Sequence, residues 1–413
     1  MPPVPALTRP PSTALSTALP PAARSRTPWQ LLPLPWSEWP AEARLLVGLT
    51  LVWSLLGLLV LSSASSFVAQ HELGDATYFI KRQLLWLIAG WSLLLLASRT
   101  TMRRWLQLAA PALIVGTLMI AATLTVGSVV MGSSRWLVIG PLQIQPSELI
   151  KPFIVLQGAL LFSQWRRLGI DRRLLWLGLF TAVILLVLKQ PNLSTAALIG
   201  LGLWLLALAA GLPLAALAGA ALAGGLLGLA SIVHNPYQLV RVTGFLNPWQ
   251  DARDSGYQLV QSLLAIGSGG MLGQGLGLST QKLQYLPIQS TDFIFAVFAE
   301  ECGFVGSLLL LLFLMIYGFV GLRIALSCRS PQHRLVAIGC IILLLGQSIL
   351  NIAVASGAMP TTGLPLPLIS YGGNSLLSSL FLVGLLLRCA LEAAAAEPPG
   401  PASPRQPASA PIG

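Results

Sequence analysis

The sequence predicts an all-α integral membrane protein of about ten transmembrane helices, with a large exported loop between the seventh and the eighth. Of its 413 residues, 55% are hydrophobic and 9% are charged, whereas soluble domains usually carry about 25% charged residues. The mean hydropathy is +0.78. The hydrophobic residues gather in long runs of Leu, Ala, Val and Ile, which need lipid around them. A soluble enzyme, secreted or cytosolic, is therefore excluded.

Ten apolar stretches reach or approach the roughly 20 residues that a helix needs to cross a hydrocarbon core about 30 Å thick. Nine and eleven spans are the alternatives. The ten stretches are Leu45 to Ser65, Leu84 to Ser98, Leu106 to Val126, Leu149 to Phe162, Leu174 to Leu188, Leu193 to Ala210, Leu214 to Val233, Phe304 to Ala325, Val336 to Ala355 and Leu376 to Leu387.

The basic residues predict the orientation. Ten spans place both termini on one side, and 16 of the 24 Lys and Arg residues then fall on that side. The positive-inside rule makes this side cytoplasmic. Because the basic residues are spread along the whole chain and form no aromatic-laced patch, the net charge of +11 is explained by topology and does not indicate nucleic acid.

Both ends of the chain differ from the membrane domain at 43–393. Residues 1–42 are rich in Pro, Ser, Thr and Ala and contain no compact apolar run, which indicates a disordered cytoplasmic tail and not a signal peptide. Residues 394–413 have a similar composition and predict a second disordered tail. The four cysteines have no metal-ligand spacing, so a disulfide framework or a zinc site is not expected.

Charged residues are rare within the spans, and the exceptions gather toward the outer surface. They are Glu148, Lys151, Lys189, Asp292, Glu300 and Glu301. A proton-coupled transporter normally buries carboxylates or histidines near the bilayer midplane. We therefore expect any chemistry at the outer membrane boundary. The longest exported segment, 234–292, is too rich in glycine to span, and its run Tyr257 to Ile266 predicts an amphipathic helix at the interface.

Each charged position has a structural and a functional interpretation. Asp292 stands where a helix begins, so it is expected either to cap that helix, which chemistry alone slightly favours, or to act as a general base beside apolar residues. Glu148 and Lys151 are three residues apart, which favours an ion pair anchoring a snorkelling lysine over a cationic lining for an anionic headgroup. Lys189 begins a helix-breaking turn or adds a further cation.

Polar residues near the C-terminal end predict interhelical contacts. Gln347 and Asn351 are four residues apart on one predicted span, so we interpret them as structural hydrogen-bonding residues. The following Pro- and Gly-rich segment, 360–375, is not expected to be helical throughout. Irregular backbone near membrane depth must be buried in protein or line a cavity.

Five segments together resemble the SEDS family of polytopic bacterial cell-wall polymerases, from about Arg44 to Arg388. The runs FLNPWQDARDSGYQ and QKLQYLP are more similar to its division branch, FtsW, than to its elongation branch, RodA. The five segments are SSRWLVIGPLQIQPSELIK (133–151), KQPNLST (189–195), YQLVQSLLAIGSGGMLGQGLG (257–277), LPIQSTDFIFAVFAEECGFVG (286–306) and GAMPTTGLPLPLISYGGNS (357–375).

The resemblance implies a peptidoglycan glycosyltransferase of the bacterial plasma (inner) membrane, which polymerises lipid II into β-1,4 glycan strands at the periplasmic face during septal cell-wall synthesis. The loop 234–292 is then periplasmic. Asp292 matches the essential acidic residue of the TDFIF motif, which would take the proton of the acceptor hydroxyl while the anomeric centre inverts. Fixed cations or a bound divalent ion, Mg²⁺ or Mn²⁺, would stabilise the leaving undecaprenyl pyrophosphate.

The matching positions give the expected substrate-binding residues, with no metal ligand among them. They are Arg135, Glu148, Lys151, Lys189, Gln190, Lys282, Glu300 and Ser370. Three positions depart from the family pattern, because Asn192, Ser290 and Asn374 stand where relatives often carry Asp, His and Ser. A charged role at position 192 is therefore not expected.

Three other functions remain open: a lipid II flippase, a RodA-type elongation polymerase and a division scaffold. The nearly uncharged spans count against the flippase. The expected partners are lipid II, a class B penicillin-binding transpeptidase, other division proteins and membrane lipid, with no nucleic acid. The expected location is the division septum, with both termini cytoplasmic.

Overall fold

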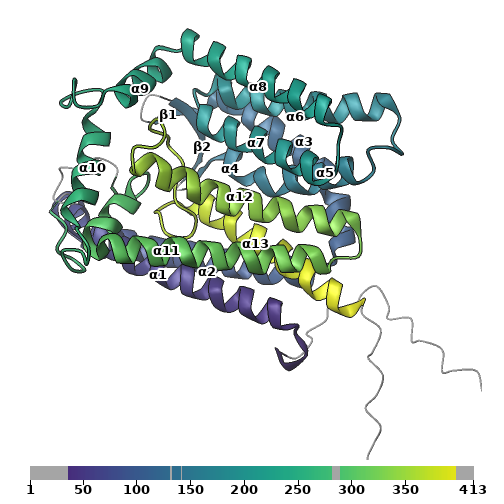
Figure 1. Ribbon diagram of the computed structural model, residues 1–413, viewed down its shortest axis with the longest axis horizontal. Helices are drawn as coiled ribbons and strands as arrows, with labels where there is room; N and C mark the ends of the chain where they lie inside the picture. Colours follow the sequence, from purple (N-terminus) through teal and green to yellow (C-terminus); the bar gives the residue numbers. More distant parts are fainter. Residues whose placement is uncertain (1–35, 131–132, 141, 281–288, 397–413) are drawn as a thin grey trace, which may run out of the picture. The chain divides into compact units, whose positions relative to one another are not determined.

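The computed structural model describes residues 36–130, 133–140, 142–280 and 289–396, which are mostly helical (Figure 1). In chain order the elements are η1 (Trp36–Glu38), α1 (Ala41–Leu73), α2 (Tyr78–Arg99), α3 (Met102–Val126), β1 (Ser128–Val130), β2 (Ser133–Ile139), β3 (Leu142–Ile144), α4 (Pro146–Leu149), α5 (Lys151–Ser163), α6 (Ile170–Lys189), α7 (Leu193–Ala209), α8 (Leu214–His234), α9 (Pro236–Leu246), α10 (Tyr257–Ser268), α11 (Ile294–Ser327), α12 (Pro331–Ala355) and α13 (Gly373–Ala395).

Within the described ranges, seven helices are long and apolar enough to cross a membrane, namely α1, α2, α3, α8, α11, α12 and α13. Each contains one of the predicted spans. The other three predicted stretches are also helical, but α7 has 17 residues, α5 has 13, and α6 carries three charged residues in its first turn. The count of ten spans therefore stays a prediction.

A small antiparallel sheet joins α3 to α4, and the prediction of an all-α protein is wrong there. β2 pairs with both β1 and β3, so that Leu137 stands opposite Ile144 and Ile139 opposite Leu142. Gly140, with a φ of 60°, suits the tight connection between β2 and β3. This segment is too short to span a bilayer and is rich in the β-branched residues Val and Ile, which favour strands.

Close helix packing forms the centre of the described bundle. α13 lies against α2, and a Cβ built on Gly384 of α13 would come within 2.8 Å of the Leu94 carbonyl oxygen of α2. Such small residues let helix backbones approach each other closely in membranes. α1 packs on α11 through Trp53, whose ring lies edge-on to that of Tyr317 at 5.0 Å.

Residues that the predicted topology places on the cytoplasmic side lie at one end of the bundle, where polar contacts join their helices. Arg388 of α13 donates to Glu392 at 2.6 Å and to the Ser98 carbonyl of α2 at 3.2 Å. Arg323 of α11 pairs with Glu42 of α1 at 3.0 Å. α9, α10 and β1 lie at the opposite end (Figure 1), which we call the outer end.

α11 is interrupted at Gly303, whose φ of 67° and ψ of −166° are not helical. The glycine-rich segment after α10 binds to this break, because Gln274 N–H donates to the Glu300 carbonyl at 3.0 Å and Phe304 N–H donates to the Gly270 carbonyl at 2.9 Å. The predicted span begins at residue 304, whereas the helix already begins at Ile294. Residues before the break thus form a separate outer section of α11.

The segment between α12 and α13 is irregular, as its Pro- and Gly-rich sequence predicts. It is nevertheless largely buried, with Leu364, Leu366 and Ile369 each no more than 2% exposed. Of the two predicted tails, residues 1–35 and 397–413 lie outside the described residues. Residues 36–42 contain η1 and the start of α1, and α13 continues to Ala395, so the helical part is slightly longer than predicted.

Candidate active site

Asp292 lies in the turn that precedes α11, at the outer end of the bundle. Its backbone carbonyl accepts a hydrogen bond from Asn351 Nδ2 of α12 at 2.8 Å. The neighbouring Thr291 carbonyl accepts one from the Ser370 hydroxyl in the buried segment before α13. Two elements far apart in the sequence therefore fix the position of this turn. The structural role predicted for Asn351 is confirmed, and it serves the turn that carries Asp292.

The carboxylate of Asp292 does not cap α11, so the capping interpretation is wrong. The residue at the N-cap position is Phe293, which makes no side-chain capping bond. A Cβ built on Gly363, in the segment between α12 and α13, would lie 3.6 Å from Asp292 Oδ2. The carboxylate is thus directed toward that segment.

Two arginines face the same region as the carboxylate. The Cβ position at Gly363 is also 3.9 Å from Arg135 Nη1, so Arg135 and Asp292 converge on one point. Arg241 of α9 donates to the Thr361 carbonyl at 3.3 Å and stacks on the Tyr237 ring at 4.5 Å. We call Asp292, Arg135 and Arg241 the outer cluster.

The turn between α6 and α7 holds Arg135 in place. Arg135 Nε donates to the Gln190 carbonyl at 3.0 Å, and Nη2 donates to the Pro191 carbonyl at 2.5 Å. The Gln190 side chain is fully buried and donates to Thr123 of α3. Gln190 therefore fixes the position of the Arg135 side chain. The neighbouring Lys189, at the end of α6, is exposed.

Burial controls the titration of the outer cluster. It raises the pKa of Asp292 from 3.8 to about 6, against the opposing effect of the positive charges of Arg241 and Arg135. Burial also lowers the pKa of the Arg135 guanidinium. A carboxylate with a pKa near 6 is ionised at neutral pH and is still a stronger base than an ordinary aspartate.

Glu148 and Lys151 form the expected ion pair, with Lys151 Nζ 2.6 Å from Glu148 Oε1. The expectation of a snorkelling lysine at the outer surface is wrong, because the two side chains are 2% and 3% exposed. A buried charge needs such a partner and further hydrogen bonds. Lys151 obtains one from Gln347 Oε1 of α12 at 2.8 Å, and Gln347 Nε2 donates to the Pro365 carbonyl at 2.8 Å.

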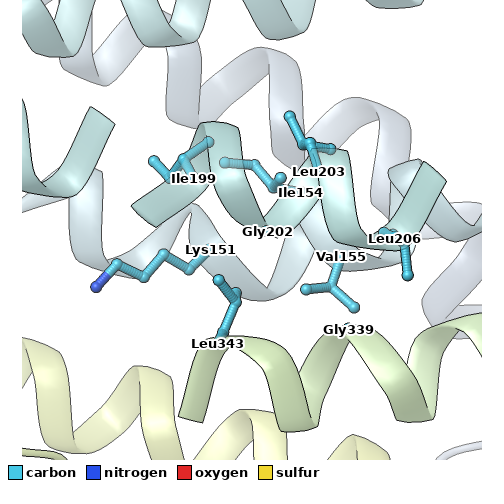
Figure 2. A pocket seen from close by; sticks show the side chains of 9 residues that line it. All are labelled: Lys151, Ile154, Val155, Ile199, Gly202, Leu203, Leu206, Gly339 and Leu343. Carbon is cyan, nitrogen blue, oxygen red and sulfur yellow. The ribbon is translucent and has the colours of Figure 1, made fainter. Parts of the chain in front are cut away.

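A cavity next to Lys151 lies between α5, α7 and α12. Its volume is about 10 Å³, which is scarcely enough for one water molecule. Its wall is apolar except for Lys151, whose nitrogen points away from Val155 and Leu206 (Figure 2). This cavity is too small for a substrate and lies apart from the outer cluster.

Glu300 and Ser370 also make structural contacts. The Glu300 carboxylate accepts from Ser279 and from the backbone and hydroxyl of Thr280, at 3.0 and 2.9 Å for Thr280. The Ser370 hydroxyl accepts from the Leu366 N–H at 2.8 Å in addition to its bond to Thr291. Both side chains are buried. Lys282 lies outside the described residues.

Arg241 is the residue of the outer cluster that sequence reasoning missed. It is the one charged residue of α9, and it is four positions from Tyr237 on the same helix face. The sequence feature that could have identified Arg241 is its place as a single arginine in an otherwise uncharged amphipathic helix. Among the described residues, no group of three or more His, Cys, Asp or Glu side chains is arranged to hold a metal ion.

Comparison with known proteins gives matches along most of the chain. A family of cell cycle proteins that comprises FtsW, RodA and SpoVE matches residues 43–395. A probable peptidoglycan glycosyltransferase FtsW from Synechocystis sp. is 51% identical over 361 residues, covering 87% of this chain and 92% of that protein. Stage V sporulation protein E of Bacillus subtilis is 36% identical over 350 residues, covering 83% and 95%.

Solved structures with the same fold are also similar in sequence. The rod shape determining protein RodA of Thermus thermophilus matches with a TM-score of 0.63 and 30% identity, covering 86% of this chain and 97% of that one. A chain from a peptidoglycan synthase complex, described for its coordination of polymerization and crosslinking, matches with a TM-score of 0.69 and 30% identity, covering 87% and 99%.

Proposed function

The chain belongs to the FtsW, RodA and SpoVE family and is a peptidoglycan glycosyltransferase, and we propose that it polymerises lipid II with Asp292 as its general base. One observation carries this proposal. The Asp292 carboxylate and the Arg135 guanidinium both lie within 4 Å of one Cβ position at Gly363. Arg241 is bound to Thr361, two residues earlier in the same segment.

The carboxylate is suited to the first part of the reaction. The 4-hydroxyl of the acceptor sugar is a weak nucleophile, so its proton is transferred to Asp292 as the oxygen attacks the anomeric carbon of the donor. A base acts best with a pKa near the working pH and contributes about 10²–10⁴-fold. The pKa of about 6 meets this requirement. Attack from the face opposite the leaving group inverts the anomeric centre and gives a β-1,4 linkage.

The arginines are suited to the second part. The bond from the anomeric carbon to the phosphate oxygen breaks, and undecaprenyl pyrophosphate departs with the electron pair. Negative charge grows on this group in the transition state, where fixed cations lower the barrier. Arg135 and Arg241 present planar guanidinium groups that match phosphate oxygens. Because Lys151 is paired with Glu148, we assign the pyrophosphate to the two arginines of the outer cluster.

The outer cluster offers one arrangement in which a divalent cation would be bound. Mg²⁺ commonly binds through one or two carboxylates together with substrate phosphates. Asp292 is the carboxylate of the outer cluster, so it and the pyrophosphate would hold such an ion, which would neutralise charge on the phosphates. Arg135 and Arg241 orient the pyrophosphate in either case.

We propose that the catalytic end is periplasmic. The residues at the opposite end include Arg323 and Arg388, which belong to the side richer in Lys and Arg. The ten predicted spans would then cross the plasma membrane with both termini in the cytoplasm. The similarity to a chain of a synthase complex supports a class B transpeptidase as partner, and the similarity to FtsW supports a role at the septum.

Purified protein supplied with labelled lipid II tests the proposal, with glycan chains separated on a gel in the presence and absence of the transpeptidase. Asp292→Asn is expected to lower the polymerisation rate about 10²–10⁴-fold, because it removes the base. Asp254→Asn is the matched control, since Asp254 is an exposed acid of the same exported segment. The control is expected to polymerise at the wild-type rate.

The same experiment separates the alternatives. Polymer formed at an unchanged rate by folded Asp292→Asn refutes the assignment of the base. Lipid II translocation in liposomes without polymerisation, unaffected by this substitution, favours a flippase. Partner binding with neither activity favours a scaffold.

A further inference from the structure

A groove on the outer half of α1 is distinct from the outer cluster. It has a volume of about 300 Å³, at the lower end of the range of small-molecule sites. α1 forms one side, and the glycine-rich segment after α10 forms the other. Its lining residues are Leu59, Ser62, Ser63, Ser66, Leu276 and Gly277.

The length of α1 places this groove near the outer membrane boundary. At a rise of about 1.5 Å per residue, a helix of 33 residues extends roughly 50 Å, which exceeds a hydrocarbon core of about 30 Å. The predicted span ends at Ser65. The groove therefore opens where sugar headgroups and lipid chains meet.

The described residues that line the groove combine three serine hydroxyls with two leucine side chains, and none of them is charged. The Ser62 hydroxyl donates to the Leu59 carbonyl at 2.7 Å, and the Ser63 hydroxyl donates to Glu301. A hydroxyl that has used its proton in this way still has lone pairs to accept hydrogen bonds. Leu59 and Leu276 add apolar surface on the two sides. Acceptor hydroxyls beside apolar walls suit the O–H groups and the C–H face of a pyranose ring.

Among the described residues, those that line the groove carry no charge, in contrast to the arginines of the outer cluster. Its walls are nevertheless connected to the segment that carries Asp292. Gln289, three residues before Asp292, donates to the Ala64 carbonyl of α1 at 3.1 Å. Glu301, which accepts from Ser63, also accepts a bond from the Gly275 N–H at 3.1 Å through its backbone carbonyl.

We propose that this groove binds a neutral, hydroxyl-rich saccharide ring at the membrane boundary. The source is the glycan strand made by the enzyme, which the groove retains between additions, or the headgroup of a neutral glycolipid. The glycan interpretation rests on the proposed function. In that case the groove keeps the strand near Asp292 and sets the length of the product.

Two variants test the site in full-length protein reconstituted into phosphatidylglycerol nanodiscs. Ser62→Ala/Ser66→Ala removes two hydroxyls, and Ser66→Phe fills the groove. Ser92→Ala is the matched control, because Ser92 donates to a carbonyl of its own helix, as Ser62 does, but lies on α2 outside the groove. The probes are soluble glycan fragments released from peptidoglycan and, in a second arm, a neutral glycosyl diacylglycerol included in the nanodisc.

Wild type and Ser92→Ala are expected to bind the glycan fragments saturably, and both groove variants to bind them at least tenfold more weakly. With labelled lipid II, the groove variants are expected to form the first linkage within twofold of the wild-type rate but to release strands several-fold shorter. Loss of retained glycolipid with unchanged strand length assigns the same site to a lipid headgroup.

Saccharide binding and strand length that are unchanged in both groove variants overturn the proposal. The double alanine variant keeps this test valid if Ser66→Phe does not fold. Failure of the proposed function gives a different result, because wild-type protein then makes no polymer while the binding arms still report on the groove.

Discussion

Two groups of charged residues near the outer end of the bundle differ in what their charges contact. In the buried pair, Glu148 and Lys151, the charged atoms are 2.6 Å apart and Gln347 completes the coordination of Lys151. In the outer cluster, Arg135 and Arg241 donate hydrogen bonds to backbone carbonyls and to Tyr237, which leaves their net positive charge facing Asp292.

The difference indicates which charges are available for chemistry. A pair that neutralises itself in the protein interior stabilises the fold and has little charge left for a substrate. Arginines held by neutral carbonyls keep their charge available for an anionic group, such as the pyrophosphate of the proposed reaction. Glu148 and Lys151, three residues apart in the sequence, and the three residues of the outer cluster, which come from β2, α9 and the turn before α11, therefore have different roles.

The largest effect expected in the buried pair is on stability. Lys151→Met leaves the Glu148 carboxylate buried without its partner, which costs about 3–5 kcal/mol of unfolding free energy. Denaturant titration in detergent measures it. Glu148→Gln/Lys151→Met removes both charges and is expected to recover most of the loss. A stable but inactive Lys151→Met protein would contradict the comparison and make Lys151 a substrate ligand.

Arg241→Gln tests the other side of the comparison. It removes a charge that faces Asp292 and, in our proposal, the pyrophosphate, so kcat/KM for lipid II is expected to fall about 10–100-fold, with a change in unfolding free energy below about 1 kcal/mol. Arg253→Gln, an exposed site in the same loop, is the control. Equal activity of both variants would remove Arg241 from the site.

Asp292→Asn has a smaller expected effect on stability, opposite in sign to that of Lys151→Met. The folded pKa of about 6 exceeds the ordinary value of 3.8, so folding favours the protonated acid, and this stabilisation is lost as pH rises from about 4 through 6. Asparagine has no such loss. We expect the variant to be about 1–2 kcal/mol more stable relative to wild type at pH 7.5 than near pH 4. Thermal unfolding at both pH values measures the difference, and a relative stability of the variant that stays constant or falls from pH 4 to pH 7.5 would contradict it.

Much of the helical fold could be predicted from the sequence because hydropathy is a local property. Each of the ten predicted stretches forms a helix, and seven meet the length and composition of a membrane span. The sheet at 128–144 and the break at Gly303 were missed. The sheet depends on strand pairing within 128–144, and the break depends on contacts with a distant segment, such as the bond from Phe304 to Gly270. Hydropathy contains no information about either kind of contact.

The sequence predicted only those residues of the site that lie in a motif of the family. Asp292 and Arg135 were found through a family resemblance, whereas Arg241 comes to the site from a helix whose motif gave no functional signal. The burial of Lys151 depends on Gln347, which is 196 residues away in the sequence. The sequence shows which positions carry a charged side chain, but it does not show the contacts that determine the role of that side chain.

The pH dependence of polymerisation tests most directly whether Asp292 is the base beside two cations. For wild type, kcat/KM is expected to rise with pH and to level off above a pKa of about 6. Because the Arg241 charge lowers the pKa of Asp292, Arg241→Gln is expected to move this break to higher pH. A rate that falls as pH rises through 6, or a break that stays in place without Arg241, would contradict the account.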